Sequence, residues 1–379
     1  MAETSSIDLV IVGEIHDSVN LSYVTRAKIY PEDPNSLFLT MRGDTATNAG
    51  GGISVYDVSD SRRPVFVSHL DVVDTVPGEL VNPNQLEGQD RIGDILVVIA
   101  LESGVVHLLD VSDPSQLFEV GSLKLHGVHE GLGYFPALHT KVYKEASSQK
   151  TYAIVTCSMS SKLIAVDISD PKNPKQVSEL QTGISDLESL YIHGSFLYCG
   201  GFQSDVMLTV DLSDIHHMRL CTILKKSYYN NLVAELDPDN DNILYASSYM
   251  ERKATEKSPW WERGLDTATD VDAPRGGLIV FDISQPETPV EISHVISEEL
   301  AGSNRVKLHA GYAFLPIEAE PGGVGIVNLR DPYNVVFERV IKSTDAIKPY
   351  ALAIKDNYIY VLGSESDTMV IKEIRTGTK

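Results

Sequence analysis

The sequence predicts an all-β fold: a seven-bladed β-propeller of four-stranded antiparallel blades, closed by its N-terminal strand. Three observations lead to this prediction. Apolar residues alternate with polar ones at a period of two, and no amphipathic helix interrupts them. A strand–turn–strand unit built on Asp-x-Ser-Asp recurs, with variations, along the chain. The two ends of the chain complement each other as parts of one further unit.

The repeated unit is an apolar strand that ends in the turn, as in Gly-Ile-Ser-Val-Tyr-Asp-Val-Ser-Asp. Its copies occupy residues 52–60, 104–114, 162–171, 206–214, 277–286 and 323–332. Another β-rich run precedes each copy, at residues 37–41, 95–100, 152–157, 196–199, 243–247 and 312–316. Asp and Ser side chains bind nearby backbone N–H groups, and the Pro that often follows fixes φ and ends the strand. Each unit therefore predicts one blade.

The chain ends predict how the ring closes. Residues 7–15 form a strand of the kind that follows each turn, but no partner strand precedes them. The last unit, residues 350–374, lacks that trailing strand. Pairing the two completes a seventh blade and hides the last strand edge. All-β rings of this length form one domain, so residues 1–379 are predicted to be a single propeller.

The units carry a family resemblance. Leu-Ile-Ala-Val-Asp-Ile-Ser-Asp-Pro, which ends at Pro171, and its counterparts resemble the LVIVD repeat family of β-propellers over nearly the whole chain. The copy at 206–214 departs from the pattern, with Ile215-His216-His217 in place of the proline, and the sixth copy has Asn328 in place of Asp. The resemblance implies the fold and a platform for binding rather than a particular reaction.

Charge restricts the partners and the compartment. The chain has 53 acidic and 31 basic residues, a formal charge of −22, which repels phosphate backbones and anionic bilayers. Nucleic acid and membranes are therefore not expected as partners. The N-terminus is acidic and its apolar run is short, which is unlike a signal peptide or a membrane anchor, so a cytoplasmic protein is predicted. Cys157 and Cys199 lie in apolar strands and are predicted to be buried free thiols.

The long connections are expected on one face of the ring. This top face holds the loops between blades and those between the second and third strands of a blade; the long loops are residues 42–51, 71–84, 124–136 and 250–275. Loops of such length commonly carry function. The insertion at 250–275 contains Trp260, Trp261 and Arg263, which suggests a lid over the channel or a hot spot for a partner. Packing of the tryptophans onto their own blade is the alternative.

Polar residues are also expected around the top mouth of the central channel. Alignment of the innermost strands places there Tyr23, Glu87, His139, Glu188, Asn231, Asn304 and Tyr350. Polar groups that converge on an axis form a recognisable ligand site. The alternative is a water-filled channel lined by hydrated side chains.

Two metal or acid–base hypotheses follow. Glu87, Glu188 and His139 supply two carboxylates and an imidazole, a set that suits a divalent metal or general acid–base catalysis. Neighbouring carboxylates would raise the pKa of one another. His126 and His129, with His139 downstream, form a second candidate metal cluster, although a Gly-rich stretch of this kind is also typical of an exposed loop.

Two classes of function remain open. The first is a binding or scaffold protein that takes a small-molecule, peptide or protein ligand at the top face. The second is an enzyme, such as a metal-dependent hydrolase, lyase or isomerase, with its site at the top of the channel. In the enzyme, Tyr350 and Asn304 would position the substrate and the loop with Trp260 and Trp261 would cover it.

Overall fold

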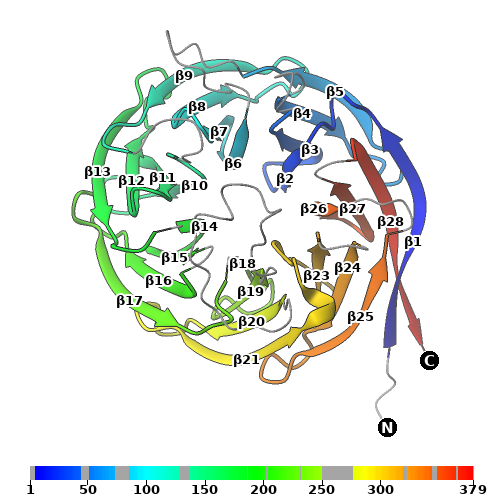
Figure 1. The fold of residues 1–379 in the computed structure, drawn as a ribbon. Helices are drawn as coiled ribbons and strands as arrows, with labels where there is room; N and C mark the ends of the chain where they lie inside the picture. Colours follow the sequence, from blue (N-terminus) through cyan, green and yellow to red (C-terminus); the bar gives the residue numbers. More distant parts are fainter. Residues whose placement is uncertain are drawn as a thin grey trace, which may run out of the picture.

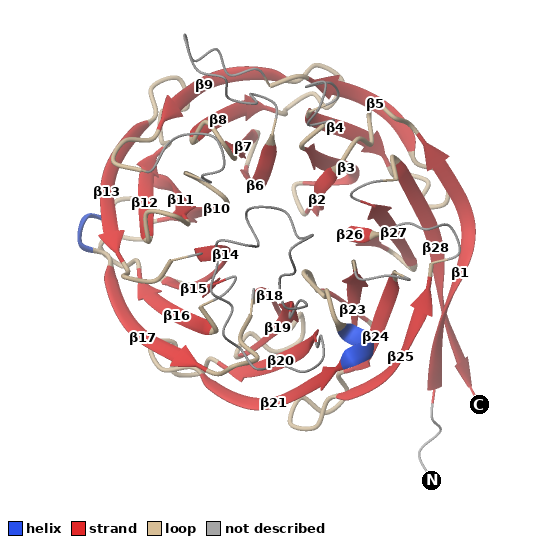
Figure 2. Ribbon diagram, in the orientation of Figure 1, coloured by secondary structure: helices blue, strands red, loops and turns tan. Residues whose placement is uncertain are grey.

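Seven four-stranded antiparallel sheets surround a central axis in the computed structural model, so the predicted seven-bladed propeller is confirmed (Figure 1). The structure describes residues 5–43, 51–72, 85–128, 136–185, 187–201, 204–230, 232–249, 276–318, 322–343, 348–363 and 366–378. Apart from two single 3₁₀ turns, η1 (Ile215–His217) and η2 (Glu298–Leu300), the described elements are all strands (Figure 2). Neither turn could cross a bilayer, and the described part of the chain has no longer helix.

Each blade runs from an innermost strand beside the axis to an outermost strand on the rim. Blade 1 consists of β2 (Val24–Tyr30), β3 (Asp33–Met41), β4 (Gly52–Asp57) and β5 (Val65–Leu70). Blade 2 consists of β6 (Leu86–Ile92), β7 (Ile95–Ala100), β8 (Val105–Asp110) and β9 (Phe118–Lys124). Blade 3 consists of β10 (Thr140–Lys144), β11 (Thr151–Cys157), β12 (Lys162–Asp167) and β13 (Lys175–Gln181).

The next three blades repeat this order. Blade 4 consists of β14 (Leu187–His193), β15 (Phe196–Gly201), β16 (Val206–Asp211) and β17 (Arg219–Lys225). Blade 5 consists of β18 (Val233–Leu236), β19 (Ile243–Tyr249), β20 (Gly276–Asp282) and β21 (Val290–Ser297). Blade 6 consists of β22 (Lys307–His309), β23 (Tyr312–Ile317), β24 (Gly323–Asn328) and β25 (Val336–Lys342).

The seventh blade joins the two ends of the chain, as the sequence predicted. It consists of β26 (Pro349–Lys355), β27 (Tyr358–Gly363), β28 (Thr368–Thr378) and, as its outermost strand, β1 (Ser5–His16). The closing strand predicted at 7–15 thus lies inside β1, which runs antiparallel to β28 from Ser5↔Thr378 to His16↔Thr368. Figure 1 shows the two strands side by side at the rim, close to both termini.

The repeated turn has the structure that its residues predict. The first Asp accepts a hydrogen bond from the backbone N–H two residues later, as Asp57 does from Ser59 (2.7 Å) and Asp167 from Ser169 (3.0 Å). Asn328 replaces this Asp in the sixth copy and accepts the same bond from Arg330. In blades 1 to 6 a β-bulge interrupts the pairing between the third strand and the outermost strand. It falls at the two residues that precede the Asp or Asn of the turn. A β-bulge of this kind increases the twist of the strand.

The hydrophobic core lies between the blades. Each of seven clusters of buried side chains joins two neighbouring sheets, and one of them contains residues of both the first and the last blade. Cys157 and Cys199 are buried free thiols in this core, which confirms that prediction. The innermost strands lie between these interfaces and the axis, and both polar and apolar residues of theirs border the central channel.

Candidate functional site

A cavity of about 540 Å³ occupies the central channel. All seven innermost strands, or the residues just before them, contribute to its wall. Its size lies within the range of small-molecule sites, roughly 300–1,000 Å³. The channel is therefore large enough to hold a small organic ligand.

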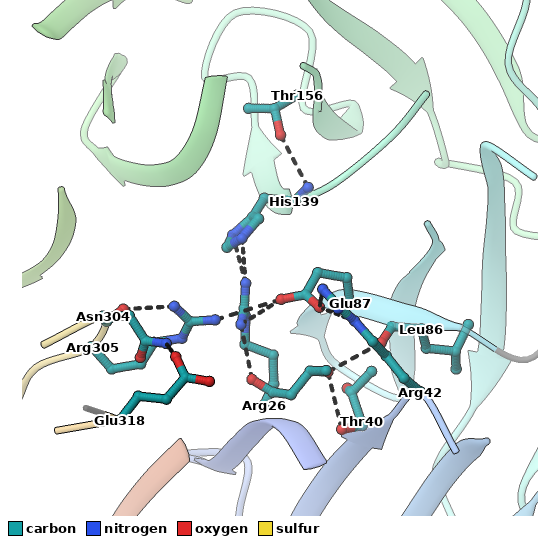
Figure 3. Close-up of polar contacts among 11 residues, drawn as sticks. Arg26, Thr40, Arg42, Leu86, Glu87, His139, Thr156, Asn304, Arg305 and Glu318 are labelled. Atoms are coloured by element: carbon teal, nitrogen blue, oxygen red, sulfur yellow. Dashed lines mark hydrogen bonds and ion pairs between the residues drawn. The ribbon is translucent and has the colours of Figure 1, made fainter. Parts of the chain in front are cut away.

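A buried carboxylate at the top mouth is enclosed by three arginines from two other blades (Figure 3). Glu87 Oε1 lies 2.8 Å from Arg26 Nη1 and 3.5 Å from Arg305 Nη2. Glu87 Oε2 accepts hydrogen bonds from Arg42 Nη2 (2.6 Å) and Nε (2.9 Å). The side chain of Glu87 is fully buried, and those of Arg26 and Arg305 are each 9% exposed. We call these four residues the arginine cluster.

Aromatic and amide groups hold the arginines in place. Arg42 lies over the ring of Tyr23 (5.4 Å to the centroid) and Arg305 over that of Tyr350 (5.0 Å), and the two rings meet edge to face. Arg305 also donates to the carbonyl of Asn304, next to it in the chain (2.6 Å). Burial, followed by the charge of Glu87, raises the pKa of Tyr350 well above its ordinary value, so this phenol is neutral.

His139 lies on the other side of Arg26, immediately before β10. Its imidazole contacts Arg26 Nη2, and its backbone N–H donates to Thr156 Oγ1 (3.0 Å). Burial, and then the charge of Arg26, lowers the pKa of His139 well below its ordinary value, so the ring is neutral. Gly88 permits this close approach of blades 2 and 3, because a Cβ there would lie 2.9 Å from the Cα of His139.

A second layer of charged side chains lies two residues further along the same three segments of chain. Lys28 follows Arg26, Lys141 follows His139 and Lys307 follows Arg305, and all six line the cavity. Asp90 Oδ1 lies 3.0 Å from Lys28 Nζ and 3.3 Å from Lys141 Nζ. The third lysine has an acid of its own, since Lys307 Nζ lies 3.1 Å from Glu235 Oε1.

The sign of the charge in the channel is opposite to that of the whole chain. Basic side chains at the cavity wall outnumber acidic ones by five to three: Arg26, Lys28, Lys141, Arg305 and Lys307 against Asp90, Glu235 and Asp356. A low-dielectric wall of one sign concentrates ligands of the other sign. The chain as a whole carries −22, so the excess of basic side chains is a local feature of the channel.

The arginine cluster also contains donors that make no hydrogen bond. Among the described residues, Nε and Nη2 of Arg305 make no hydrogen bond; Nη2 lies 3.5 Å from Glu87 Oε1, an oxygen that also lacks a hydrogen bond, whereas Nε has no such acceptor beside it in the described contacts. Buried donors without acceptors are rare in folded proteins and are costly. Arg305 lines the cavity, so a ligand in the channel could supply the acceptors.

The predicted polar mouth is partly assembled as expected. Tyr23, Glu87, Asn304 and Tyr350 do gather at the top of the channel with His139. Of these five residues, His139 alone lines the cavity, while the others surround the arginines. Asn231, Trp260, Trp261 and Arg263, also predicted to bind ligand, lie outside the described residues, as does the whole 250–275 insertion.

The structure does not assemble Glu87, Glu188 and His139 as a metal site. Within the described ranges, no three His, Cys, Asp or Glu side chains are arranged to hold one ion. Arg26 contacts both Glu87 and His139, and the groups around Glu87 are guanidinium cations rather than carboxylates. Glu188 is half-buried at the bulge of β14, where its charge, after burial, raises the pKa of Cys199.

The second predicted metal cluster is also separated. His126 is exposed, and its backbone N–H and carbonyl are both bonded to the side chain of Gln176 on the outermost strand β13. His139 is buried beside the innermost strand β10. His129 lies outside the described residues. The width of a blade therefore separates His126 from His139.

One contact chain on the rim has the residue types of a catalytic triad. His69 Nδ1 lies 2.9 Å from Ser54 Oγ, and its Nε2 lies 3.2 Å from Asp71 Oδ1. Ser54 and His69 are a cross-strand pair of β4 and β5, and Ser54 is fully buried between its neighbours. A nucleophile must be reached by its substrate, so this arrangement stabilises the blade rather than forming an active site.

The arginines were not among the predicted site residues, although the sequence contains a signal for them. Arg26-Ala-Lys28 and Arg305-Val-Lys307 are basic pairs at a spacing of two, at the start of two innermost strands. Residues two apart in a strand face the same side. A basic pair in an otherwise acidic chain, at the same place in two blades, would have indicated a cationic channel.

Comparison with known proteins supports the fold. The LVIVD repeat family matches residues 98–124, 152–182 and 273–296, so the chain carries LVIVD repeats in a β-propeller. No curated protein sequence matches the chain.

Among solved structures, a putative 6-phosphogluconolactonase from Bacteroides fragilis is similar, with a TM-score of 0.63 and 10% identity over 88% of this chain and 87% of that one. A putative 6-phosphogluconolactonase from Bacteroides uniformis has a TM-score of 0.61 and 12% identity over 84% and 85%. A periplasmic gluconolactonase from Pseudomonas aeruginosa has a TM-score of 0.59 and 12% identity over 94% and 88%. At these identities the likeness extends to the lactonase-type propeller fold and no further.

Proposed function

We propose that this chain, an LVIVD-repeat β-propeller, binds a small organic anion in its central channel, with a carboxylate or phosphate of the ligand against the arginine cluster. The observation that carries the proposal is the pair of buried Arg305 donors that make no hydrogen bond among the described residues. An anionic oxygen is the acceptor that a guanidinium binds best, often through two parallel hydrogen bonds.

The arrangement of charge supports the same proposal. Glu87 is the acid in each described ion pair of Arg26, Arg42 and Arg305, and a second carboxylate, that of Glu318, lies 3.5 Å from the Asn304 amide next to Arg305 (Figure 3). Three guanidinium cations therefore face two carboxylates, which leaves the group with excess positive charge. Unneutralised charge away from bulk water is unfavourable. An anionic ligand would therefore stabilise the folded chain as well as bind to it.

The test is calorimetric titration of the purified chain with malonate, citrate, inorganic phosphate and a phosphorylated sugar acid, with glucose as the neutral comparison. Loss of a hydrogen bond to a charged group costs about 1.5–3 kcal/mol. Arg305→Gln should therefore weaken anion binding by about tenfold or more. Arg219→Gln is the matched control, because Arg219 is a rim arginine, paired with Asp211 and Glu287, whose side chain is 54% exposed. Equal affinity in the two variants, or no binding of any anion, would refute the proposal.

Catalysis at the same site is the second candidate, and His139 favours it. The neutral imidazole lines the cavity beside Arg26, and a neutral imidazole can act as a general base. Two proteins of similar structure are named a putative 6-phosphogluconolactonase and a periplasmic gluconolactonase, so hydrolysis of a sugar-acid lactone, which releases a carboxylate, is the reaction to test first. Proton release from such a lactone should occur with the wild-type chain and be lost in His139→Gln. Equal rates in the two would remove this candidate.

The protein or peptide ligand predicted for the top face remains a prediction. The long loops expected to form that surface lie mostly outside the described residues.

A further inference from the structure

Two lysines compete for one carboxylate on the channel wall, below the arginine cluster. Lys28 of β2 and Lys141 of β10 both direct Nζ to Oδ1 of Asp90, at 3.0 and 3.3 Å. The other oxygen, Oδ2, accepts the backbone N–H of Val142 (2.9 Å). Lys28 Nζ also donates to the carbonyl of Gln89 (3.2 Å), and the charge of Glu235 also acts on Lys141. Asp90 is the one carboxylate in the described ion pairs of these two lysines, so one negative charge is in direct contact with two amines.

This geometry favours one neutral and one charged lysine. Burial lowers the pKa of Lys28, and the nearby charge of Lys141 lowers it further. The charge of Asp90 raises the pKa but does not fully offset these effects, so the pKa of Lys28 is about 7. Burial also acts on Lys141, but the charge of Asp90, the hydrogen bonds to Lys28 and Asp90 and the charge of Glu235 together outweigh it and raise the pKa of Lys141. At neutral pH a large fraction of Lys28 is thus a free amine, against roughly one part in a thousand for a lysine of ordinary pKa. An amine beside another cation is the arrangement that makes a lysine nucleophilic.

The side chain of Lys28 also borders the open channel. Its side chain is 24% exposed and lines the same cavity as Arg26 and Arg305. Arg26 and Lys28 are two residues apart on β2, a rise of about 6.6 Å along the strand. A molecule with a carboxylate at one end and a carbonyl a few atoms away can reach both side chains.

We infer that Lys28 is a carbonyl-reactive amine, which forms an imine with an aldehyde or oxo acid whose carboxylate lies against Arg26 and Arg305. The carboxylate part of this inference rests on the proposed function; the reactivity of Lys28 does not.

The step requires no external reagent. The Nζ lone pair of Lys28 attacks the carbonyl carbon, a C–N bond forms, and the carbonyl oxygen takes a proton to give a carbinolamine. The C–O bond then breaks, and the oxygen leaves as water with a second proton. Nitrogen loses two protons and oxygen gains two, so the balance is amine plus carbonyl to imine plus water. Asp90 contacts both Lys28 and Lys141. Its carboxylate is placed to accept a proton from Lys28, and the Lys141 ammonium is placed to donate a proton to the carbonyl oxygen.

Lys307 is the internal control. It lines the same cavity, and its Nζ contacts one acid, Glu235, at 3.1 Å. No second lysine contacts that carboxylate among the described ion pairs, so Lys307, unlike Lys28, does not share its acid with another lysine.

The experiment is reductive trapping at pH 7. The full chain is incubated with glyoxylate or with propanal and sodium cyanoborohydride, digested, and mapped by mass spectrometry. Reduction converts the imine to a secondary amine and adds to the lysine the mass of the ligand less one oxygen atom. We expect label on Lys28 at least about tenfold above that on Lys307, because of the difference in free amine. Lys141→Met should lower the label on Lys28 about tenfold, since Asp90 then holds Lys28 alone as an ammonium.

The two aldehydes separate the inference from the proposed function. Glyoxylate should label Lys28 at about tenfold lower concentration than propanal, and Arg305→Gln should remove that advantage while leaving propanal labelling intact. If the wild-type chain needs as much glyoxylate as propanal for labelling of Lys28, the proposed anion site is contradicted and the reactivity of Lys28 is not. Label on Lys28 no greater than on Lys307, in a chain that still binds malonate, would overturn the inference about Lys28 and leave the anion site standing.

Discussion

Arg26 and Glu87 form an ion pair between the innermost strands of two neighbouring blades, with Nη1 and Oε1 2.8 Å apart. Both side chains are almost completely enclosed, at 9% and 0% exposed. Water screens such a pair poorly, so loss of either partner leaves the other as a buried uncompensated charge. The pair therefore links the stability of the ring to Arg26, which lines the channel.

Glu87→Gln should destabilise the chain, because Arg26, Arg42 and Arg305 then share no carboxylate. We expect the free energy of unfolding in urea to fall by about 3 kcal/mol or more. Malonate or phosphate should restore more stability to the variant than to the wild type, since a bound anion replaces the lost charge.

Glu287→Gln is the control for this prediction. Glu287 pairs with Arg219 on the rim, where both side chains are about half exposed, and an exposed pair contributes less than about 1 kcal/mol. A loss in Glu87→Gln as small as that in Glu287→Gln would show that the arginine cluster does not need its carboxylate.

Stability should rise with pH on the alkaline side because of Lys28. Its native pKa of about 7 lies below its ordinary value of 10.5, so unfolding in this window takes up a proton. The free energy of unfolding should therefore increase by about 2 kcal/mol between pH 7 and 9. Urea unfolding at the two pH values measures this rise. Lys28→Met should abolish it and Lys307→Met should retain it; a rise that persists without Lys28 would assign it to another group.

The closing strand provides a matched pair of substitutions. Leu9 on β1 is buried in the cluster between blades 6 and 7, whereas Ile11, two residues along the same strand, is 40% exposed. Leu9→Ala should cost about 2–5 kcal/mol of unfolding free energy, and Ile11→Ala much less. Equal losses in thermal or urea unfolding would mean that β1 contributes pairing with β28 but no core packing.

The thiols should differ in reactivity. Burial raises the pKa of Cys157 to about 12 and raises that of Cys199 as well, while Cys221 is less enclosed. Because the thiolate is the reactive form, a thiol reagent at pH 8 should modify Cys221 alone in the native chain and all three cysteines in denaturant. Rapid reaction of Cys157 or Cys199 without denaturant would indicate opening of the blade interfaces.

Sequence alone determined the blades and the closure of the ring. The Asp-x-Ser-Asp turn acts through hydrogen bonds two residues apart, as between Asp57 and Ser59, so its structure is encoded locally. Period-two alternation likewise fixes which side of a strand enters the interface between sheets. The unpaired strand near Ile7 and the incomplete last unit had one consistent solution, which is the pairing of β1 with β28.

Only the tertiary structure decided which side chains meet at the axis. Alignment of the innermost strands is uncertain by a residue or two, and a shift of one residue turns a side chain to the other face of its strand. Asn304 and Glu188 were predicted to face the channel, but their neighbours Arg305 and Ser189 line the cavity. Glu87 was correctly placed at the mouth; that it meets Arg26, Arg42 and Arg305 depends on how four chain segments, up to 279 residues apart by their numbering, converge there. The basic pairs Arg26-Ala-Lys28 and Arg305-Val-Lys307 could have indicated a cationic channel, but a local pattern does not specify which side chains meet, because long side chains from separate blades form these contacts.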